Sequence, residues 1–195
     1  MVHVKFNLAK LEKLNDPARF ESLPPEVLWT ALGAPSGACA VIEIGAGTGL
    51  FAAAFVALAP EAVIYAADTE DAMLEWMRLN RPEVARRRIT PVKAGESSVP
   101  LDDEIADAVY MINLHHELAR PAESYAEAFR LLEPGGRVLV VDWARRDTPK
   151  GPPLETRATA DTVAALLAAA RFTDIRVDET TLPWHFMAMA GKPRL

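Results

Sequence analysis

The fold is decided by the stretch Val41-Ile42-Glu43-Ile44-Gly45-Ala46-Gly47-Thr48-Gly49. An apolar, β-branched run that ends in glycines predicts a buried strand at Ala40 to Ile44, and the apolar residues beyond it predict a helix at Thr48 to Leu58. Glycine adopts positive φ angles and lets a ligand approach the backbone, while the start of a helix presents free N–H groups. The stretch therefore predicts a nucleotide-type cofactor site at the carboxyl end of the first strand.

Strands and helices alternate along the chain beyond this stretch. Further strands are predicted at Ala62 to Ala67, Ile89 to Ala94, Asp107 to Ile112 and Val138 to Val141, and helices at Glu70 to Leu79, Ala122 to Leu132 and Thr162 to Ala170. Two extended stretches, Asp174 to Leu182 and Phe186 to Ala190, follow as a hairpin. This order predicts an α/β fold: a Rossmann-like, doubly wound, mostly parallel seven-stranded sheet with an antiparallel C-terminal hairpin strand.

Composition narrows the class of protein. The 195 residues fit one domain, which we divide into an N-terminal helical cap or lid at 1–35 and a core at 36–195. A net charge of −6 disfavours a nucleic-acid partner, because phosphate binding calls for a basic surplus. The single cysteine, Cys39, excludes an internal disulfide, and no Cys/His cluster has metal-ligand spacing. The longest apolar run, Leu50 to Ala59, is too short to span a bilayer, so we expect a cytoplasmic protein without a membrane partner.

Two acids near the glycines indicate which cofactor binds. Asp68 lies 19 residues after Gly49, close to the spacing of about 20 for an acid that binds ribose hydroxyls. Glu43 lies inside the apolar strand, where a carboxylate is costly unless it has a partner. S-adenosylmethionine has no phosphate and carries a cationic amino group and a sulfonium, both of which attract a carboxylate. The two acids therefore favour S-adenosylmethionine.

An NAD-type dinucleotide fits this pattern less well. The dinucleotide fingerprint G-x-G-x-x-G would place its last glycine at residue 50, which is Leu50. A pyrophosphate at the helix N-terminus would also be repelled by Glu43. An NAD-dependent oxidoreductase stays open as an alternative function, and so does a non-catalytic S-adenosylmethionine-binding protein.

The same residues resemble class I S-adenosylmethionine-dependent methyltransferases, and the resemblance extends from about Val41 to Lys192. The glycine-rich stretch resembles their first motif, and Asp68 matches the acid that holds both ribose hydroxyls. Gly95-Glu96-Ser97 falls where many members have a Gly-Asp-Ala segment that contacts adenine, and it departs from them in Glu and Ser. The chain most resembles the small-molecule branch related to quinone and sterol methyltransferases. The resemblance implies methyl transfer to a small-molecule acceptor, with S-adenosylhomocysteine as the other product.

We expect the cofactor to be bound by residues of the glycine turn, the second strand's end and the neighbouring loops. They are Phe6, Glu43, Gly45, Ala46, Gly47, Gly49, Asp68, Thr69, Met73, Glu96, Ser97 and Asn113.

The candidate catalytic residues are His115, His116 and Asp142. The two histidines come just after the fourth strand, and Asp142 with Trp143 ends the fifth, so both groups fall at the edge where the acceptor meets the methyl group. The imidazole of histidine ordinarily has a pKa of about 6.5, which suits proton abstraction near neutral pH. The alternative for the histidines is packing or capping of the following helix.

The segment Val4 to Leu14 precedes the first strand and has no place in the sheet. We expect it to close over the bound cofactor, with Phe6 as its apolar contact and Pro17 as a hinge. The alternative is permanent packing on the outside of the domain.

Overall fold

A seven-stranded sheet runs through the computed structural model, which describes residues 8–194. The strands are β1 (Ala40–Ile44), β2 (Val63–Asp68), β3 (Ile89–Lys93), β4 (Ala106–Ile112), β5 (Leu132–Trp143), β6 (Thr173–Asp178) and β7 (His185–Gly191). Their order is β3-β2-β1-β4-β5-β7-β6, and β7 is antiparallel to both of its neighbours while β1 to β5 pair in parallel. The predicted fold class is confirmed.

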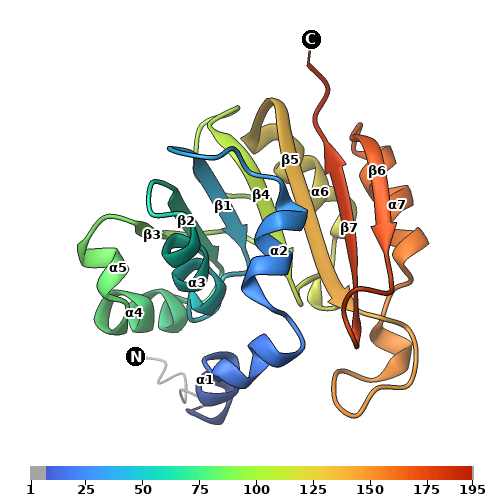
Figure 1. The fold of residues 1–195 in the computed structure, drawn as a ribbon, viewed down its shortest axis with the longest axis horizontal. Helices are drawn as coiled ribbons and strands as arrows, with labels where there is room; N and C mark the ends of the chain where they lie inside the picture. Colours follow the sequence, from blue (N-terminus) through green and yellow to red (C-terminus); the bar gives the residue numbers. More distant parts are fainter. Residues whose placement is uncertain (1–7, 195) are drawn as a thin grey trace.

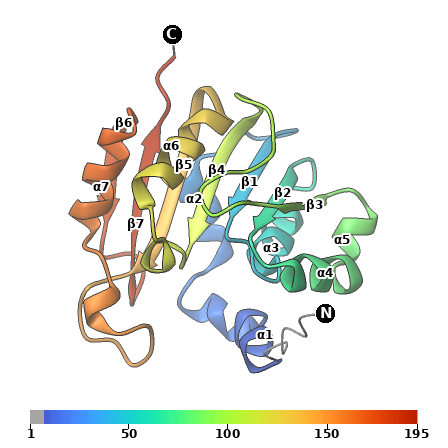
Figure 2. The same ribbon diagram turned by 180° about the vertical axis from the view of Figure 1, so that it is seen from behind.

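Helices cover both faces of the sheet. They are α1 (Leu8–Leu14), α2 (Pro25–Leu32), α3 (Leu50–Leu58), α4 (Asp71–Asn80), α5 (Pro82–Ala85), α6 (Pro121–Leu131) and α7 (Ala160–Ala169), with short 3-10 helices η1 (Pro17–Glu21), η2 (His115–Glu117) and η3 (Leu154–Thr156). In Figure 1, α2 and α3 lie in front of the sheet. Figure 2 shows α6 and α7 on the opposite face. None of the helices within 8–194 is long and apolar enough to cross a membrane.

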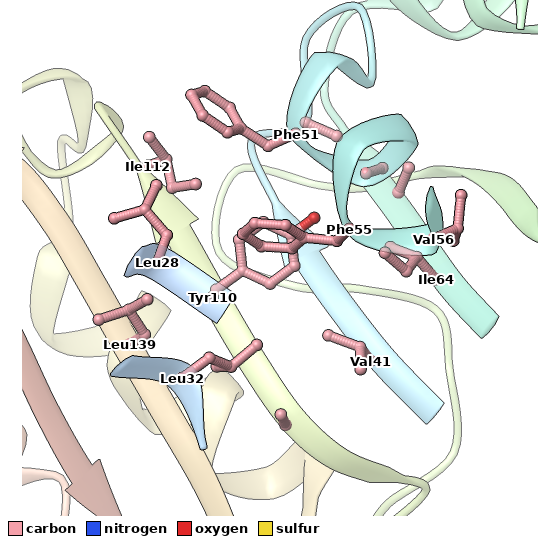
Figure 3. Close-up of a cluster of buried hydrophobic side chains, with 14 of the residues drawn as sticks. Leu28, Leu32, Val41, Phe51, Phe55, Val56, Ile64, Tyr110, Ile112 and Leu139 are labelled. Carbon is pink, nitrogen blue, oxygen red and sulfur yellow. The ribbon is translucent and has the colours of Figure 1, made fainter. Parts of the chain in front are cut away.

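Apolar side chains form one core on each face. On the α3 face, Phe55 and Tyr110 are fully buried with ring centroids 4.9 Å apart, and Figure 3 shows their rings in front of β1 and β4. Such an aromatic pair contributes about 0.5–1.5 kcal/mol beyond its area burial. Leu28 and Leu32 of α2 join this core, so α2 packs on the sheet. The core fixes β1 and β4, whose carboxyl ends carry the predicted site.

The N-terminal part of the chain divides at α2. Both views place α1 beyond the carboxyl ends of the parallel strands, away from the layer that α2 helps to form (Figure 1, Figure 2). Asp16 caps η1 by accepting a hydrogen bond from the Ala18 amide at 2.9 Å, and Pro17 starts that helix. Phe6 and the rest of residues 1–7 lie outside the described residues. The division of the chain at residue 35 and the lid therefore remain predictions.

Candidate functional site

The glycine turn after β1 is fastened to the end of β2. The amides of Gly45 and Ala46 donate to the Ala67 carbonyl at 2.9 and 3.0 Å. The Gly47 amide donates to Asp68 Oδ2 at 2.6 Å. Because β1 and β2 pair in parallel with Ile44 opposite Ala67, these bonds hold the turn and the acid at one edge of the sheet. The predicted strand-turn-helix geometry is therefore present.

The glycines of this turn meet different surroundings. A Cβ at Gly49 would lie 2.8 Å from Met77 Sδ, so Gly49 allows α3 and α4 to pack closely. Among the described side chains a Cβ at Gly47 would meet Leu14 Cδ1 alone, at 3.6 Å, and Gly47 lines the pocket beside the turn. Gly47 also has a φ of 55°, which few residues other than glycine adopt.

A pocket of about 250 Å³ opens at the carboxyl ends of β1, β2 and β4. Most of the predicted cofactor residues line it: Glu43, Gly45, Ala46, Gly47, Asp68, Thr69, Met73, Glu96 and Asn113. Gly49 lies behind it, and Ser97 does not line it, because the Ser97 hydroxyl is buried in the loop after β3. Phe6 is outside the described residues. The structure thus brings together nine of the twelve predicted residues, and we call this space the turn pocket.

Glu43 is the buried acid of the turn pocket. Its carboxylate is 2% exposed and accepts a hydrogen bond from the Tyr110 hydroxyl at 3.0 Å. Burial raises the pKa of Glu43 to about 8, against the opposing effects of Tyr110 and the nearby Arg19 charge. Glu43 is therefore largely protonated at neutral pH in the free protein, and it is poised to ionise when a cation enters the pocket.

Asp68 presents its carboxylate at the end of β2. Oδ1 accepts from the Glu70 amide at 2.8 Å, and Oδ2 accepts from Gly47. These two backbone bonds fix the orientation of the carboxylate. This arrangement fits the predicted ribose-binding acid.

Arg19 is a pocket residue that the sequence did not indicate. It belongs to η1, donates from Nη1 to the Leu14 carbonyl at 2.9 Å, and lies over the Phe51 ring with Cζ 4.9 Å from the centroid. Among the described residues that line the turn pocket it is the only base, facing the acids Glu43, Asp68, Glu70, Glu96 and Glu117. No motif marks an arginine in a short 3-10 helix, since its position follows from tertiary packing.

A second pocket of about 420 Å³ adjoins the first, and we call it the adjoining pocket. The two share Leu14, Arg19, Asn113 and Glu117. Its remaining lining residues are Lys13, Asp16, Ser22, Leu23, His116, Trp143, Lys150, Gly151, Pro152 and His185. Pockets for small molecules are commonly about 300–1,000 Å³. The pair of pockets has the arrangement that a two-substrate reaction needs.

Asn113 stands where the two pockets meet. It follows β4 with a φ of 56°, a conformation in which asparagine is enriched. Its amide donates to the Val141 carbonyl at 2.8 Å, which fixes the residue to β5. Its side-chain Oδ1 is buried and has no hydrogen-bond partner among residues 8–194, so an acceptor atom faces the shared wall unused.

His116 and Asp142 form an ion pair in the adjoining pocket. His116 Nδ1 lies 2.8 Å from Asp142 Oδ1, and the His116 amide donates to Asp142 Oδ2 at 3.3 Å. Burial lowers the pKa of His116, but the hydrogen bond and charge of Asp142 outweigh it, so the pKa is raised overall. When the imidazole is neutral, Nδ1 donates to Asp142 and the lone pair is on Nε2, which lies 3.8 Å from Glu117 Oε1. This geometry is suited to a general base.

His115 is placed differently from the prediction. Its Nδ1 lies 2.7 Å from the Tyr125 hydroxyl, and the two rings stack with centroids 5.8 Å apart. It is buried against α6 and lines neither pocket, and burial lowers its pKa. Packing onto the following helix, the alternative that the sequence left open, therefore describes His115. The catalytic candidates reduce to His116 and Asp142.

Gly47→Ala tests whether the turn is built around a ligand. We expect cofactor affinity to fall at least tenfold, because the methyl group is added to a residue that lines the turn pocket. Gly33→Ala is the matched control, since Gly33 has a similar φ of 65°, its Cβ would also meet only one atom, and it lies away from both pockets. An alanine in the left-handed region costs each variant about 1–2 kcal/mol of stability. Calorimetric titration should show weaker binding for Gly47→Ala alone, and equal affinities would make the turn purely structural.

A family model described as "Methyltransferase domain" matches residues 42–140. The chain is 28% identical over 170 residues to a demethylmenaquinone methyltransferase of Clavibacter sepedonicus, covering 84% of this chain and 68% of that protein. It is 30% identical over 154 residues to a malonyl-[acyl-carrier protein] O-methyltransferase of Methylococcus capsulatus, covering 73% and 54%. The chain thus spans about half to two thirds of the length of these relatives.

Solved structures agree with the observed fold. The crystal structure of a SAM-dependent methyltransferase from Aquifex aeolicus superimposes with a TM-score of 0.83 at 25% sequence identity, covering 96% of this chain and 99% of the other.

Proposed function

This chain belongs to the methyltransferase domain family of class I S-adenosylmethionine-dependent enzymes, and we propose that it methylates a small-molecule acceptor held in the adjoining pocket. The observation that carries the proposal is that the two pockets share one wall. The turn pocket is lined by the glycine turn with Glu43 and Asp68, while the adjoining pocket is lined by His116, whose Nδ1 pairs with Asp142.

The turn pocket suits S-adenosylmethionine in several respects. In this proposal Asp68 binds the ribose, the turn at Gly47 leaves room for the methionine portion, and Glu43 binds the amino group. Arg19 supplies the positive charge that the cofactor's carboxylate needs. When bound, the cofactor supplies a methyl group made electrophilic by its sulfonium.

His116 and Asp142 are proposed to remove the acceptor's proton. His116 Nε2 accepts it while Asp142 stabilises the resulting imidazolium, as a buried carboxylate does for a histidine base. The acceptor is then a group that must lose a proton to become nucleophilic, such as a hydroxyl. The walls that η1, β4 and β5 supply hold the two reactants in line. Such positioning lowers the activation free energy by about 7–11 kcal/mol in favourable cases.

An NAD-type oxidoreductase is not favoured. A pyrophosphate in the turn pocket would face Glu43, Asp68, Glu70, Glu96 and Glu117, with Arg19 the single base among the described lining residues. The charge of the pocket therefore opposes a dinucleotide.

Titration with S-adenosylmethionine tests the proposal most directly. We expect saturable heat and competition by S-adenosylhomocysteine, and the absence of both would contradict it. A screen of small hydroxylated acceptors with methyl-labelled cofactor then separates an enzyme from a non-catalytic binder, which would bind cofactor and label nothing.

Glu43 makes cofactor binding release a proton. At pH 7 the free protein holds this carboxyl largely protonated, because its pKa is raised to about 8. A bound ammonium favours the carboxylate, so the proton leaves on binding and affinity rises with pH up to about 8. Calorimetry in buffers of different ionisation enthalpy should find close to one proton released by the wild type and none by Glu43→Gln, with affinity about 10- to 150-fold lower in the variant. Equal proton release by the wild type and Glu43→Gln would show that Glu43 does not bind the amino group.

A further inference from the structure

His185 is a buried imidazole with no hydrogen bond. It is the first residue of β7 and pairs with Trp143 of β5 in the antiparallel register. The side chain is 0% exposed, and neither Nδ1 nor Nε2 has a hydrogen-bond partner among residues 11–194. His185 nevertheless lines the adjoining pocket, so this unpaired imidazole borders a space that a ligand can enter.

The protein loses stability by keeping this residue. A neutral imidazole carries one N–H donor and one acceptor lone pair, and burying either without a partner costs free energy. Burial is the main cause that lowers the pKa of His185 to about 4, so protonation does not relieve the cost at neutral pH. An aromatic hydrocarbon side chain of similar shape would fill the same place without this loss.

The surroundings of His185 are aromatic and held in place. The ring of Trp143 lies 4.2 Å from that of His185, centroid to centroid. Arg157 Cζ lies 5.5 Å from the centroid of the Trp143 ring. A Cβ at Gly151 would lie 2.8 Å from Trp143 Cε3, so the chain at Gly151 packs closely on the same ring. Arg157 is itself fixed by bonds to the carbonyls of Ala144, Arg146 and Pro152. The indole is therefore a rigid, flat wall beside the unpaired nitrogens.

We propose that His185 binds a carbonyl or hydroxyl oxygen on a planar, ring-containing acceptor that lies along Trp143. The proposal rests on the assignment of the adjoining pocket to the acceptor. His185 is then a specificity-determining residue: it accepts or donates one hydrogen bond to the acceptor while His116, on the same pocket, handles the proton at the methylated atom. Ring compounds without the oxygen leave the imidazole unpaired and bind less well.

The test compares 1-tetralone with tetralin, which share their rings and differ in one carbonyl oxygen. A carbonyl oxygen accepts but cannot donate, so it can pair with a His185 N–H and not with an unprotonated imidazole nitrogen. In the presence of S-adenosylhomocysteine we expect the ratio of the two dissociation constants to shift by about 5- to 150-fold between wild type and His185→Phe. His185→Gln keeps a donor and an acceptor and should retain part of the preference.

Two further readouts separate recognition from structure. His185→Phe should bind S-adenosylhomocysteine like the wild type and unfold at the same or a higher temperature. In wild-type protein labelled with ¹⁵N-histidine, 1-tetralone should shift the His185 ring nitrogens and tetralin should not, a measurement that needs no variant to fold.

An unchanged ratio in His185→Phe, no ring shift, or no binding of 1-tetralone by the wild type would each overturn the role of His185. Failure of the wild type to bind S-adenosylhomocysteine would instead contradict the proposed function.

Discussion

Replacing His116 with glutamine should lower turnover by about 10²- to 10⁴-fold, the usual contribution of a general base. The affinity for S-adenosylhomocysteine should stay within twofold, because His116 lines the adjoining pocket and not the turn pocket. The measurement is methyl transfer from labelled cofactor to the acceptor that the screen identifies. Undiminished turnover would mean that the acceptor needs no base from the protein.

The pH profile provides the control for this assignment. The pKa of His116 is raised above its ordinary value, because the hydrogen bond and charge of Asp142 outweigh burial. Turnover should therefore rise with pH and level off above that raised pKa, where Nε2 is unprotonated. In Asp142→Asn the charge is lost, so the midpoint should move to lower pH while turnover falls. A midpoint that does not move would separate Asp142 from the titration.

Asp68→Ala should weaken cofactor binding more than any other single polar truncation, by at least 100-fold. One carboxylate would accept from two ribose hydroxyls, and hydrogen bonds to a charged group contribute about 1.5–3 kcal/mol each. The same change also removes the hydrogen bonds that Asp68 accepts from the amides of Gly47 and Glu70. The glycine turn then loses its side-chain hydrogen bond to the end of β2.

Asp71→Ala is the matched control. Asp71 lies three residues beyond Asp68, lines neither pocket and pairs with Lys93 at 2.9 Å on an exposed surface. Its loss should leave affinity unchanged and cost about 0–1 kcal/mol of stability. Calorimetry and thermal unfolding measure both effects, and wild-type affinity in Asp68→Ala would remove this acid from the site.

Local sequence predicted the bounds of a strand well where its apolar run is buried on both faces of the sheet. β1 matches its predicted bounds, and β4 differs by one residue, because their β-branched apolar runs are buried on both sides. The predicted start of β5 was wrong, because the strand was expected from Val138 and begins at Leu132. The reason is distant, since the Gly135 amide donates to the Lys192 carbonyl and the Lys192 amide donates back to Gly136, both at 2.9 Å. A glycine pair that reads as a turn is thus held in the sheet by residues at the far end of the chain.

The candidate site likewise contains residues that local sequence indicates and residues that only tertiary packing brings together. The glycine turn, Glu43 and Asp68 follow one another along the chain at spacings that reflect their chemistry, so sequence indicated where they meet. Arg19 and His185 carry no such spacing, and each reaches its pocket only through packing of η1 or β7 against the strand ends. The two histidines after β4 look alike in sequence, and only the positions of Asp142 and Tyr125 distinguish a pocket residue from a packed one.

The shared wall has a consequence for how such a chain diverges. The segment that matches the methyltransferase family, residues 42–140, contains almost the whole turn pocket. Of the adjoining pocket it contains only Asn113, His116 and Glu117, whereas the other lining residues described come from the end of α1, η1 and its flanks, the last residue of β5 with the loop after it, and β7. Substitutions at those outlying positions, apart from Leu14 and Arg19, which line both pockets, can therefore change which molecule is accepted without disturbing the cofactor. Selection that acts on the two ends of the chain can produce a new acceptor specificity while residues 42–140 stay unaltered.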